Sequence, residues 1–368
     1  MRVLVAPDQF AGSLSAGQAA RAIAEGWSAH SPSATLTVAP MSDGGCGFVD
    51  VMHEALDGQL VAVTLRGPLA GTTPGAVLLD GSTAYVESAQ AVGSHLVAHA
   101  DRDPERATSY GVGELVAAAV DAGAKRVLVG VGDGVTNDGG TGLLAALGAT
   151  ADVDLGSGPA ALQGVTRVDL APARARLDGV ELVMATDDTI PLLGLFGTTK
   201  AAGSDRGVSA DRVAALDLLL DAWVVAAIGS TPARRRPADA PGAGAAGGVG
   251  FGLLVLGATR ESGLAAVARA SDLAARACES DLVVTGEAAY DFSSRAGSVV
   301  YGVAQIAQTA LRPCVVLAER VLVGAREMRA MGVESAYAVA DLASEPATGD
   351  PTAGLHQLAR RVARTWSR

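Results

Sequence analysis

Short β-branched runs alternate with longer helical patterns along most of this chain of 368 residues. The runs typical of strands are MRVLVAP (1–7), ATLTVAPM (34–41), KRVLVGV (125–131), ELVMATDD (181–188), DLVVTGE (281–287), PCVVLAE (313–319) and ESAYAVAD (334–341). Helical patterns lie between or beside them, at 13–27, 109–123, 210–229 and 352–366. Successive strands joined through a helix pair in parallel, because the connection must return to the starting end of the sheet. The alternation therefore predicts an α/β fold with helices on both faces of a parallel sheet.

The alternation of strand-like and helical runs stops after the second strand. Three strand-like runs, QLVAVTLRG, TPGAVLLDG and STAYVESA, are joined by short turns, which is typical of antiparallel pairs. The chain is also about twice the usual domain length. We therefore predict a Rossmann-like α/β domain built from both chain ends, 1–62 and 280–368, and an inserted α/β domain, 63–279, with a cleft between them. The most loop-like segment is STPARRRPADAPGAGAAGG, 230–248.

Charge and cysteine content exclude several kinds of partner. The formal net charge is −11, whereas nucleic acids and anionic membrane surfaces select basic proteins. No apolar run approaches the length of a membrane span. Three widely spaced cysteines suggest a reducing, cytoplasmic environment. A homo-oligomer is compatible with the sequence, which leaves the oligomeric state open.

Five acidic, mostly glycine-rich turns follow predicted strands. They are APDQFAGS (6–13), PMSDGGCG (40–47), GVGDGVTNDGG (130–140), ATDDTIP (185–191) and TGEAAYDFSS (285–294). Ligands of open parallel sheets bind outside the carboxyl ends of the strands, and Mg²⁺ prefers one or two carboxylates together with phosphate oxygens. Any one of these turns could be an ordinary turn or helix cap, but their recurrence favours a magnesium-phosphate site.

A further glycine-rich segment, GAGAAGG (242–248), contains a G-x-G-x-x-G match. The dinucleotide-binding fingerprint requires a strand before these glycines, and here a Pro/Arg-rich loop precedes them. The segment therefore does not fit the dinucleotide-binding fingerprint. A glycine-rich loop that opens a helix and approaches a phosphate stays open.

Together, the motifs resemble the bacterial glycerate kinase family, whose members phosphorylate glycerate. The matching segments are APD.F..SLSA (6–16), SDGG.G (42–47), TSYGVGEL (108–115), TNDGG.G (136–142), D...PL.G (187–194), FG..K (196–200), PGAGAAGG (241–248) and TGE...D (285–291). The resemblance implies ATP, Mg²⁺ and a small substrate, D-glycerate or a related hydroxy acid, meeting in a cleft between two α/β domains.

It also implies roles for individual residues. The catalytic candidates are Asp187, Lys200 and Asp43, and the metal-ligand candidates are Asp187, Glu287 and Asp291. The candidates for binding the nucleotide are Asp8, Ser13, Asn137, Asp138, Gly139, Gly140, Gly244, Gly247 and Gly248. We expect five of the acids to line one cleft, namely Asp8, Asp43, Asp138, Asp187 and Glu287. Lys200, one of only two lysines, or Arg295 would supply positive charge for the transferred phosphate.

Several positions depart from the family pattern. The family usually has lysine at Ala11, glutamate at Cys46, glycine at Asp133, asparagine at Ile190, arginine at Ala289, histidine at Ala296, lysine at Ser298 and glycine at Glu319. The losses after Glu287 leave two interpretations open. One is an ATP-dependent kinase with a remodelled site, and the other is a catalytically lapsed homologue that binds a ligand or partner. A structural scaffold would not need the TNDGG and PGAGAAGG turns.

Overall fold

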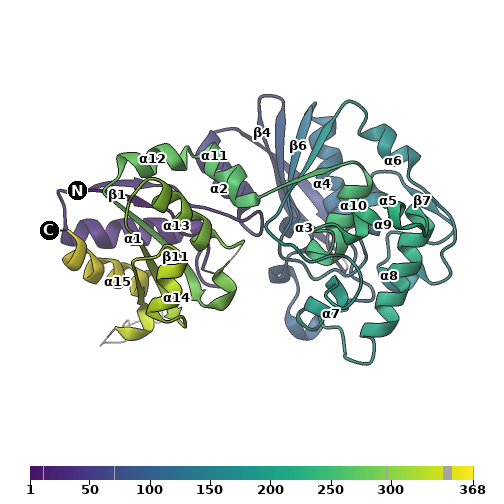
Figure 1. The fold of residues 1–368 in the computed structure, drawn as a ribbon. Coiled ribbons are helices and arrows are strands. Elements are labelled where there is room, and N and C mark those ends of the chain that lie inside the picture. The colour runs from purple at the N-terminus through teal and green to yellow at the C-terminus, as the bar shows by residue number, and fades with distance from the viewer. Residues whose placement is uncertain (11, 70, 296, 343–349, 368) are drawn as a thin grey trace. The chain divides into compact units, whose positions relative to one another are not determined.

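The computed structural model describes residues 1–10, 12–69, 71–295, 297–342 and 350–367. The chain forms two compact units. The first comprises Met1–Asp43, Asp50–Leu56 and Leu264–Arg368, and the second comprises Gly44–Val49 and Asp57–Gly263. Both chain ends lie in the first unit (Figure 1).

These units divide the chain at other places than the sequence suggested, at 62/63 and 279/280. Strand β3 (Gln59–Arg66) pairs along its whole length with β4 (Thr72–Asp80), so the chain cannot change unit at residue 62. Helix α12 (Leu273–Glu279) packs against β1 (Arg2–Val5), which places it with the first unit.

The first unit is built on a five-stranded sheet in which every pair is parallel. The strand order is β13-β12-β11-β1-β2. The strands not yet given are β2 (Thr35–Val38), β11 (Leu282–Tyr290), β12 (Cys314–Val321) and β13 (Ser335–Ala338). The predicted α/β class is confirmed. Successive strands are added toward one edge and then the other, so the order reverses between β1 and β11, and this switch point is where open sheets of this kind bind ligands.

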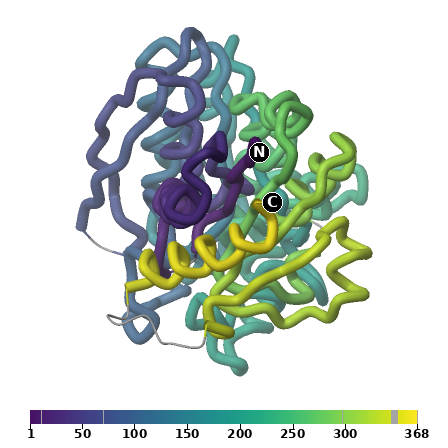
Figure 2. Tube along the Cα trace, turned by 90° about the vertical axis from the view of Figure 1, so that its left-hand side faces the viewer, coloured from purple at the N-terminus to yellow at the C-terminus, as the bar shows by residue number. Residues whose placement is uncertain are grey.

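Helices cover this sheet. On one face α1 (Ala16–His30) and α15 (Pro351–Trp366) pack side by side, as Figure 2 shows in purple and yellow. A capping box begins α1. The Ser15 hydroxyl accepts from the backbone N–H of Gln18, and the Gln18 side-chain oxygen accepts from the backbone N–H of Ser15. Alternate strand residues face these helices, and α12 and α13 (Val299–Thr309) pack on strands of the same sheet.

The second unit contains a six-stranded mixed sheet of order β10-β9-β6-β5-β4-β3. The antiparallel pairing predicted after the second strand is confirmed, because β3, β4 and β5 (Thr83–Glu87) form a meander. Strands β6 (Arg126–Gly130), β9 (Glu181–Ala185) and β10 (Thr259–Glu261) continue the sheet in parallel with β5. The carboxyl ends of these four strands therefore share one edge.

The helices of the second unit surround a core that includes Trp223 and Phe251, whose rings meet edge to face. They are α3 (Ala89–Val92), α4 (Tyr110–Asp121), α5 (Thr141–Ala146), α6 (Ala171–Arg176), α7 (Thr198–Ala202), α8 (Val213–Ile228), α9 (Pro232–Asp239) and α10 (Val249–Val255). The remaining elements are α2 (Phe48–Leu56), α11 (Gly263–Ala270), α14 (Ala325–Ala330) and the short pair β7 (Thr150–Ala151) and β8 (Val168–Asp169). No helix in the described part of the chain is long and apolar enough to cross a membrane.

The interpretation of 230–248 as a loop is wrong for residues 232–239, which form α9. Pro232 stands in the first turn of the helix, where the missing N–H has no intrahelical partner to lose. Arg235 then pairs with Asp221 of α8 at 2.5 Å and ties the two helices together. The Pro/Arg-rich composition suggested a loop, because the contact with α8 that stabilises this helix cannot be read from the local sequence.

Gly26 provides a test of the α1–α15 packing. A Cβ at this position would lie 2.2 Å from the carbonyl oxygen of His356 in α15. We expect Gly26→Ala to lower the free energy of unfolding by about 1–3 kcal/mol, because overpacking outweighs the gain in helix propensity. Urea denaturation measures this change. The control is Ser28→Ala on the exposed side of α1, and equal stability of the two variants would show that the helices separate without cost.

Candidate active site

Three of the predicted acids come together in the first unit. Asp8 follows β1, Asp43 lies a few residues beyond β2, and Glu287 lies in the last part of β11. Burial raises the pKa of Asp8 well above its usual value, and repulsion by Asp43 and Glu287 raises it further. The carboxylates therefore gather at the carboxyl edge of the sheet, beside the switch point between β1 and β11.

One side-chain oxygen of Glu287 lacks a hydrogen-bond partner in the described structure. This oxygen, Oε1, is buried. Burial raises the pKa of Glu287 to about 7, with a hydrogen bond from Ser294 opposing the rise and repulsion by Asp291 adding to it. A buried carboxylate oxygen without a partner is stabilised by gaining a proton or a cation.

The loop after Glu287 is held by short polar caps. Asp291 begins a 3₁₀ turn at Phe292–Ser294, and its Oδ1 accepts from the N–H of Ser293 at 2.7 Å and from its hydroxyl at 2.6 Å. These hydrogen bonds lower the pKa of Asp291. Ser298 caps α13 by accepting from the Tyr301 N–H at 3.1 Å. One oxygen of the predicted metal ligand Asp291 is thus engaged in the loop.

Two other departures from the family pattern in this unit, Ala289 and Glu319, have local partners. Ala289 stands opposite Arg320 in the register of β11 and β12. The hydroxyl of Ser13, a predicted nucleotide contact, donates to Oε1 of Glu319 at 2.8 Å. Arg295 lies over the ring of Phe292, 5.1 Å from its centroid. Ala11 and Ala296 lie outside the described residues.

In the second unit, the loop after β6 packs directly on the glycine-rich segment 242–248. A Cβ on Gly247 would lie 1.8 Å from the carbonyl oxygen of Thr136. The Gly139 N–H donates to the Gly247 carbonyl at 2.9 Å, and the Thr136 hydroxyl donates to the Ala246 carbonyl at 2.9 Å. Only glycine permits such an approach of two backbones, and Gly247 also has a φ of +70°.

This packing uses N–H groups that the sequence assigned to a phosphate. Gly140 donates to Asp138 Oδ1 at 3.0 Å, Gly244 to the Ile190 carbonyl at 2.8 Å, and Gly247 to the Gly244 carbonyl at 3.1 Å. The bonds of Gly140 and Gly247 stabilise their own turns, and that of Gly244 joins its segment to the loop after β9. The contact of these glycines with a nucleotide, and that of Gly248, stays a prediction.

Asp138 is fully buried and serves the same junction. Its carboxylate accepts from the N–H and the hydroxyl of Ser109, both at 2.8 Å, and from the N–H of Gly142 at 3.1 Å. Burial raises its pKa, and these hydrogen bonds partly offset the rise. Asp138 therefore orients the starts of α4 and α5 and presents no surface to a ligand, which differs from the expectation that it lines a cleft with the other acids.

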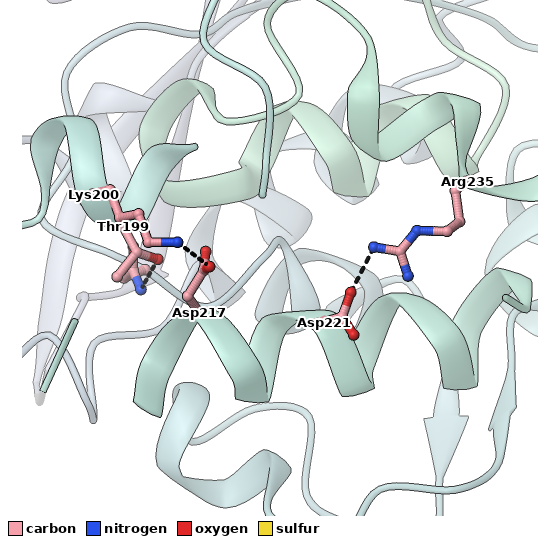
Figure 3. Close-up of polar contacts among 6 residues, drawn as sticks. Thr199, Lys200, Asp217, Asp221 and Arg235 are labelled. Atoms are coloured by element: carbon pink, nitrogen blue, oxygen red, sulfur yellow. Dashed lines mark hydrogen bonds and ion pairs between the residues drawn. The ribbon is translucent and has the colours of Figure 1, made fainter. Parts of the chain in front are cut away.

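Asn137 and Lys200 are linked through the first turn of α7. The side-chain amide of Asn137 donates to the Thr199 hydroxyl at 3.1 Å. The neighbouring Lys200 Nζ pairs with Oδ2 of Asp217 in α8 at 2.7 Å (Figure 3). The lysine assigned to a phosphate therefore has a carboxylate partner within its own unit. The remaining acidic candidate of this unit, Asp187, follows β9 and is partly buried.

The sequence analysis missed a buried cation, Arg206, which is 7% exposed. Its Nε donates to the Gly134 carbonyl at 3.1 Å, and its Nη1 donates to the carbonyl and the hydroxyl of Thr198 at 3.0 and 2.9 Å. Arg206 thus joins the loop after β6 to α7. It stands in an ordinary GSDRG stretch of an arginine-rich sequence, so no pattern distinguished it.

Metal binding by side chains alone finds no support. Within the described ranges, no three His, Cys, Asp or Glu residues lie close enough together to hold an ion. Mg²⁺ does not require such a cage, because it commonly binds one or two carboxylates together with phosphate oxygens and water. The acidic edge of the first unit is compatible with that mode.

Comparisons with known proteins agree along the whole chain. A family model described as the glycerate kinase family matches residues 3–367. The glycerate kinase of Bacillus subtilis is 35% identical, with 92% of this chain and 90% of that protein covered. The glycerate 2-kinase of Escherichia coli is 34% identical with the same coverage. A crystal structure of a putative glycerate kinase 2 from Salmonella typhimurium superposes with a TM-score of 0.80 at 32% identity, covering 100% of this chain and 98% of that one.

Glu287 predicts an unusual pH dependence of stability in metal-free protein. Its pKa rises from 4.5 to about 7 on folding, so between these pH values the native state holds a proton that the unfolded chain has released. Stability should fall as the pH rises through this window. We expect Glu287→Gln to leave stability unchanged near pH 4 and to raise it by about 2–3 kcal/mol near pH 8.

Urea denaturation across this pH range, without divalent ions, measures the effect. The matched control is Glu279→Gln, at an exposed site in α12 of the same unit. Parallel pH profiles for wild type and Glu287→Gln would contradict the assignment of an unmet buried carboxylate.

Proposed function

This chain belongs to the glycerate kinase family, and we propose that it transfers the γ-phosphoryl group of ATP to a hydroxyl of D-glycerate or a related small hydroxy acid. The observation that carries the proposal is the acidic edge of the first unit. Asp8, Asp43 and Glu287 gather there at the switch point of a parallel sheet. Such a position suits a polyphosphate accompanied by a cation.

The residues of this edge fit Mg²⁺. Glu287 Oε1 is buried without a partner in the described structure, and two neighbouring carboxylates repel Asp8. We propose that Glu287 holds the ion, with Asp8 beside it and phosphate oxygens completing the coordination. When bound, Mg²⁺ neutralises charge on the polyphosphate. Asp187, the other ligand suggested by the sequence, belongs to the second unit and stays a prediction.

The chain's own groups have two further tasks. One carboxylate, that of Asp43 or Asp187, orients the acceptor hydroxyl and takes its proton as the new O–P bond forms. The bond between the γ-phosphorus and the β–γ bridging oxygen breaks, and ADP leaves. Most of the acceleration in such reactions comes from positioning and charge stabilisation. The proposed cation on the transferred group is Lys200, which would exchange Asp217 for phosphate.

Lys200 provides the first test. We expect Lys200→Ala to lower kcat for ADP release with D-glycerate by roughly 10³, as loss of a phosphate cation does in other transferases. The matched control is Arg235→Ala, which removes another ion pair to α8, that with Asp221 (Figure 3). It should leave kcat within about twofold of wild type, in line with the small energy of such pairs.

A second control removes the effect of an unpaired acid. Lys200→Ala leaves Asp217 without its partner, and Asp217 Oδ1 is already buried with no hydrogen bond among the described residues. The double variant Lys200→Ala/Asp217→Asn removes that charge. It should be as slow as the single variant. Recovery of kcat in the double variant would show that Lys200 acts only as a structural partner.

The altered loop separates an active kinase from a lapsed homologue. We expect wild type to release ADP with D-glycerate, and Ala289→Arg to change kcat less than tenfold, because Arg320 already stands opposite this position. Adding Ser298→Lys removes the α13 cap and should cost about 1 kcal/mol of stability, so both variants are needed. A silent wild type with an active variant would instead identify a lapsed enzyme. Silence in all three, with no ATP binding by calorimetry, would contradict the kinase proposal.

A further inference from the structure

A cavity of about 260 Å³ lies within the second unit, and its lining includes none of the acidic residues of the first unit. It opens between the loop after β6, the end of α7 and the 3₁₀ turn Ser204–Arg206. Its lining includes Arg102, Asp133, Gly134, Ala202, Asp205 and Arg206. Two arginines and two aspartates thus face a space large enough for a small organic acid.

Some N–H donors of the Arg206 guanidinium form no hydrogen bond with the described residues. A guanidinium carries five N–H groups. The Nε and Nη1 groups of Arg206 bond to Gly134 and Thr198, as described above. No hydrogen bond of its Nη2 and no ion pair of this side chain occurs in the described part of the chain, and Nη2 is not among the enclosed atoms without a partner, so a ligand in the cavity can reach it.

A buried cation without an ion pair is costly. Burial lowers the pKa of Arg206 to about 10, although the fields of Asp188, Asp133 and Asp205 oppose this. The side chain therefore stays positively charged at neutral pH. Leaving a buried charge uncompensated is strongly destabilising, whereas a hydrogen-bonded counter-ion removes much of the penalty. An anion that reaches Nη2 would supply that compensation.

The other lining groups restrict the kind of anion. Arg102 donates to the carbonyls of Val97, Ser94 and Asp205, so its guanidinium is used to hold the walls. Asp133 is exposed, and its Oδ2 accepts from the Ser94 N–H at 2.6 Å. Its second oxygen can accept from a ligand hydroxyl. Two aspartates in the lining disfavour a doubly charged anion and favour a singly charged carboxylate.

We propose that this cavity binds a small hydroxy acid, with the carboxylate on Nη2 of Arg206 and a hydroxyl donating to Asp133. The inference rests on the proposed function, for which it names the residues that recognise the acceptor. Arginine suits this task because its planar fork matches a carboxylate.

Ligand binding to the unaltered protein tests the proposal without risk to folding. We expect calorimetry without nucleotide to show binding of D-glycerate, about tenfold weaker binding of propionate, which lacks hydroxyls, and no binding of glycerol, which lacks the carboxylate. Inorganic phosphate should bind more weakly than D-glycerate. Equal binding of glycerol and D-glycerate, or tighter binding of phosphate, would overturn the proposal.

Variants then locate the site. Arg206→Lys should weaken D-glycerate and propionate alike by about tenfold, because a point charge replaces a fork. Asp133→Ala, at an exposed position, should weaken D-glycerate but leave propionate unchanged or tighter. The matched control is Arg174→Lys, an arginine of the same unit that donates to the Val255 carbonyl away from the cavity. It should bind both acids as wild type does.

An assay of ADP release with the same variants separates this proposal from the kinase proposal. If wild type phosphorylates D-glycerate and both Arg206→Lys and Asp133→Ala keep its KM, the cavity proposal is overturned and the kinase proposal stands. If wild type releases no ADP but binds hydroxy acids through Arg206, the cavity proposal stands and the kinase proposal fails. A wild type that binds none of these acids overturns the cavity proposal outright.

Discussion

The second unit depends on one backbone contact, that between the carbonyl of Thr136 and the α-carbon of Gly247. A side chain at 247 would overlap that carbonyl, so two segments more than a hundred residues apart can meet only through glycine. The contact fixes the loop after β6 against the segment that begins α10. Asn137 and Asp138 then reach α7 and the starts of α4 and α5 from one rigid junction.

The first unit depends on strand order in the same way. Because β1 pairs with both β2 and β11, chain segments from opposite ends of the sequence finish at one edge of the sheet. At that edge, burial disfavours the charged form of Asp8, and repulsion by Asp43 and Glu287 disfavours it further. A bound cation at this edge would improve the balance of charge.

The sequence could predict the strands, most of the helices and the acidic turns, because these follow from local periodicity and turn chemistry. It could also place Asp8 directly after a strand, but it ended the strand that carries Glu287 too early, because β11 continues to Tyr290. It could not predict α9, whose ion pair from Arg235 to Asp221 is tertiary. Nor could it predict that the glycines after Thr136 bond to the protein, or that Arg206 is buried, since burial depends on what packs around a residue.

Each candidate site contains a charged side chain with a polar atom that has no partner among the described residues, and the two side chains have opposite sign. In the first unit a buried oxygen of Glu287 has no partner among the described residues. In the second, Nη2 of Arg206 has no acceptor within the same described set. Protein interiors rarely leave such groups without a partner, because each costs stability. A kinase that binds a cation with a polyphosphate and a carboxylate acceptor would satisfy both groups, each within its own unit, so the ligands themselves would complete the electrostatic balance of the fold.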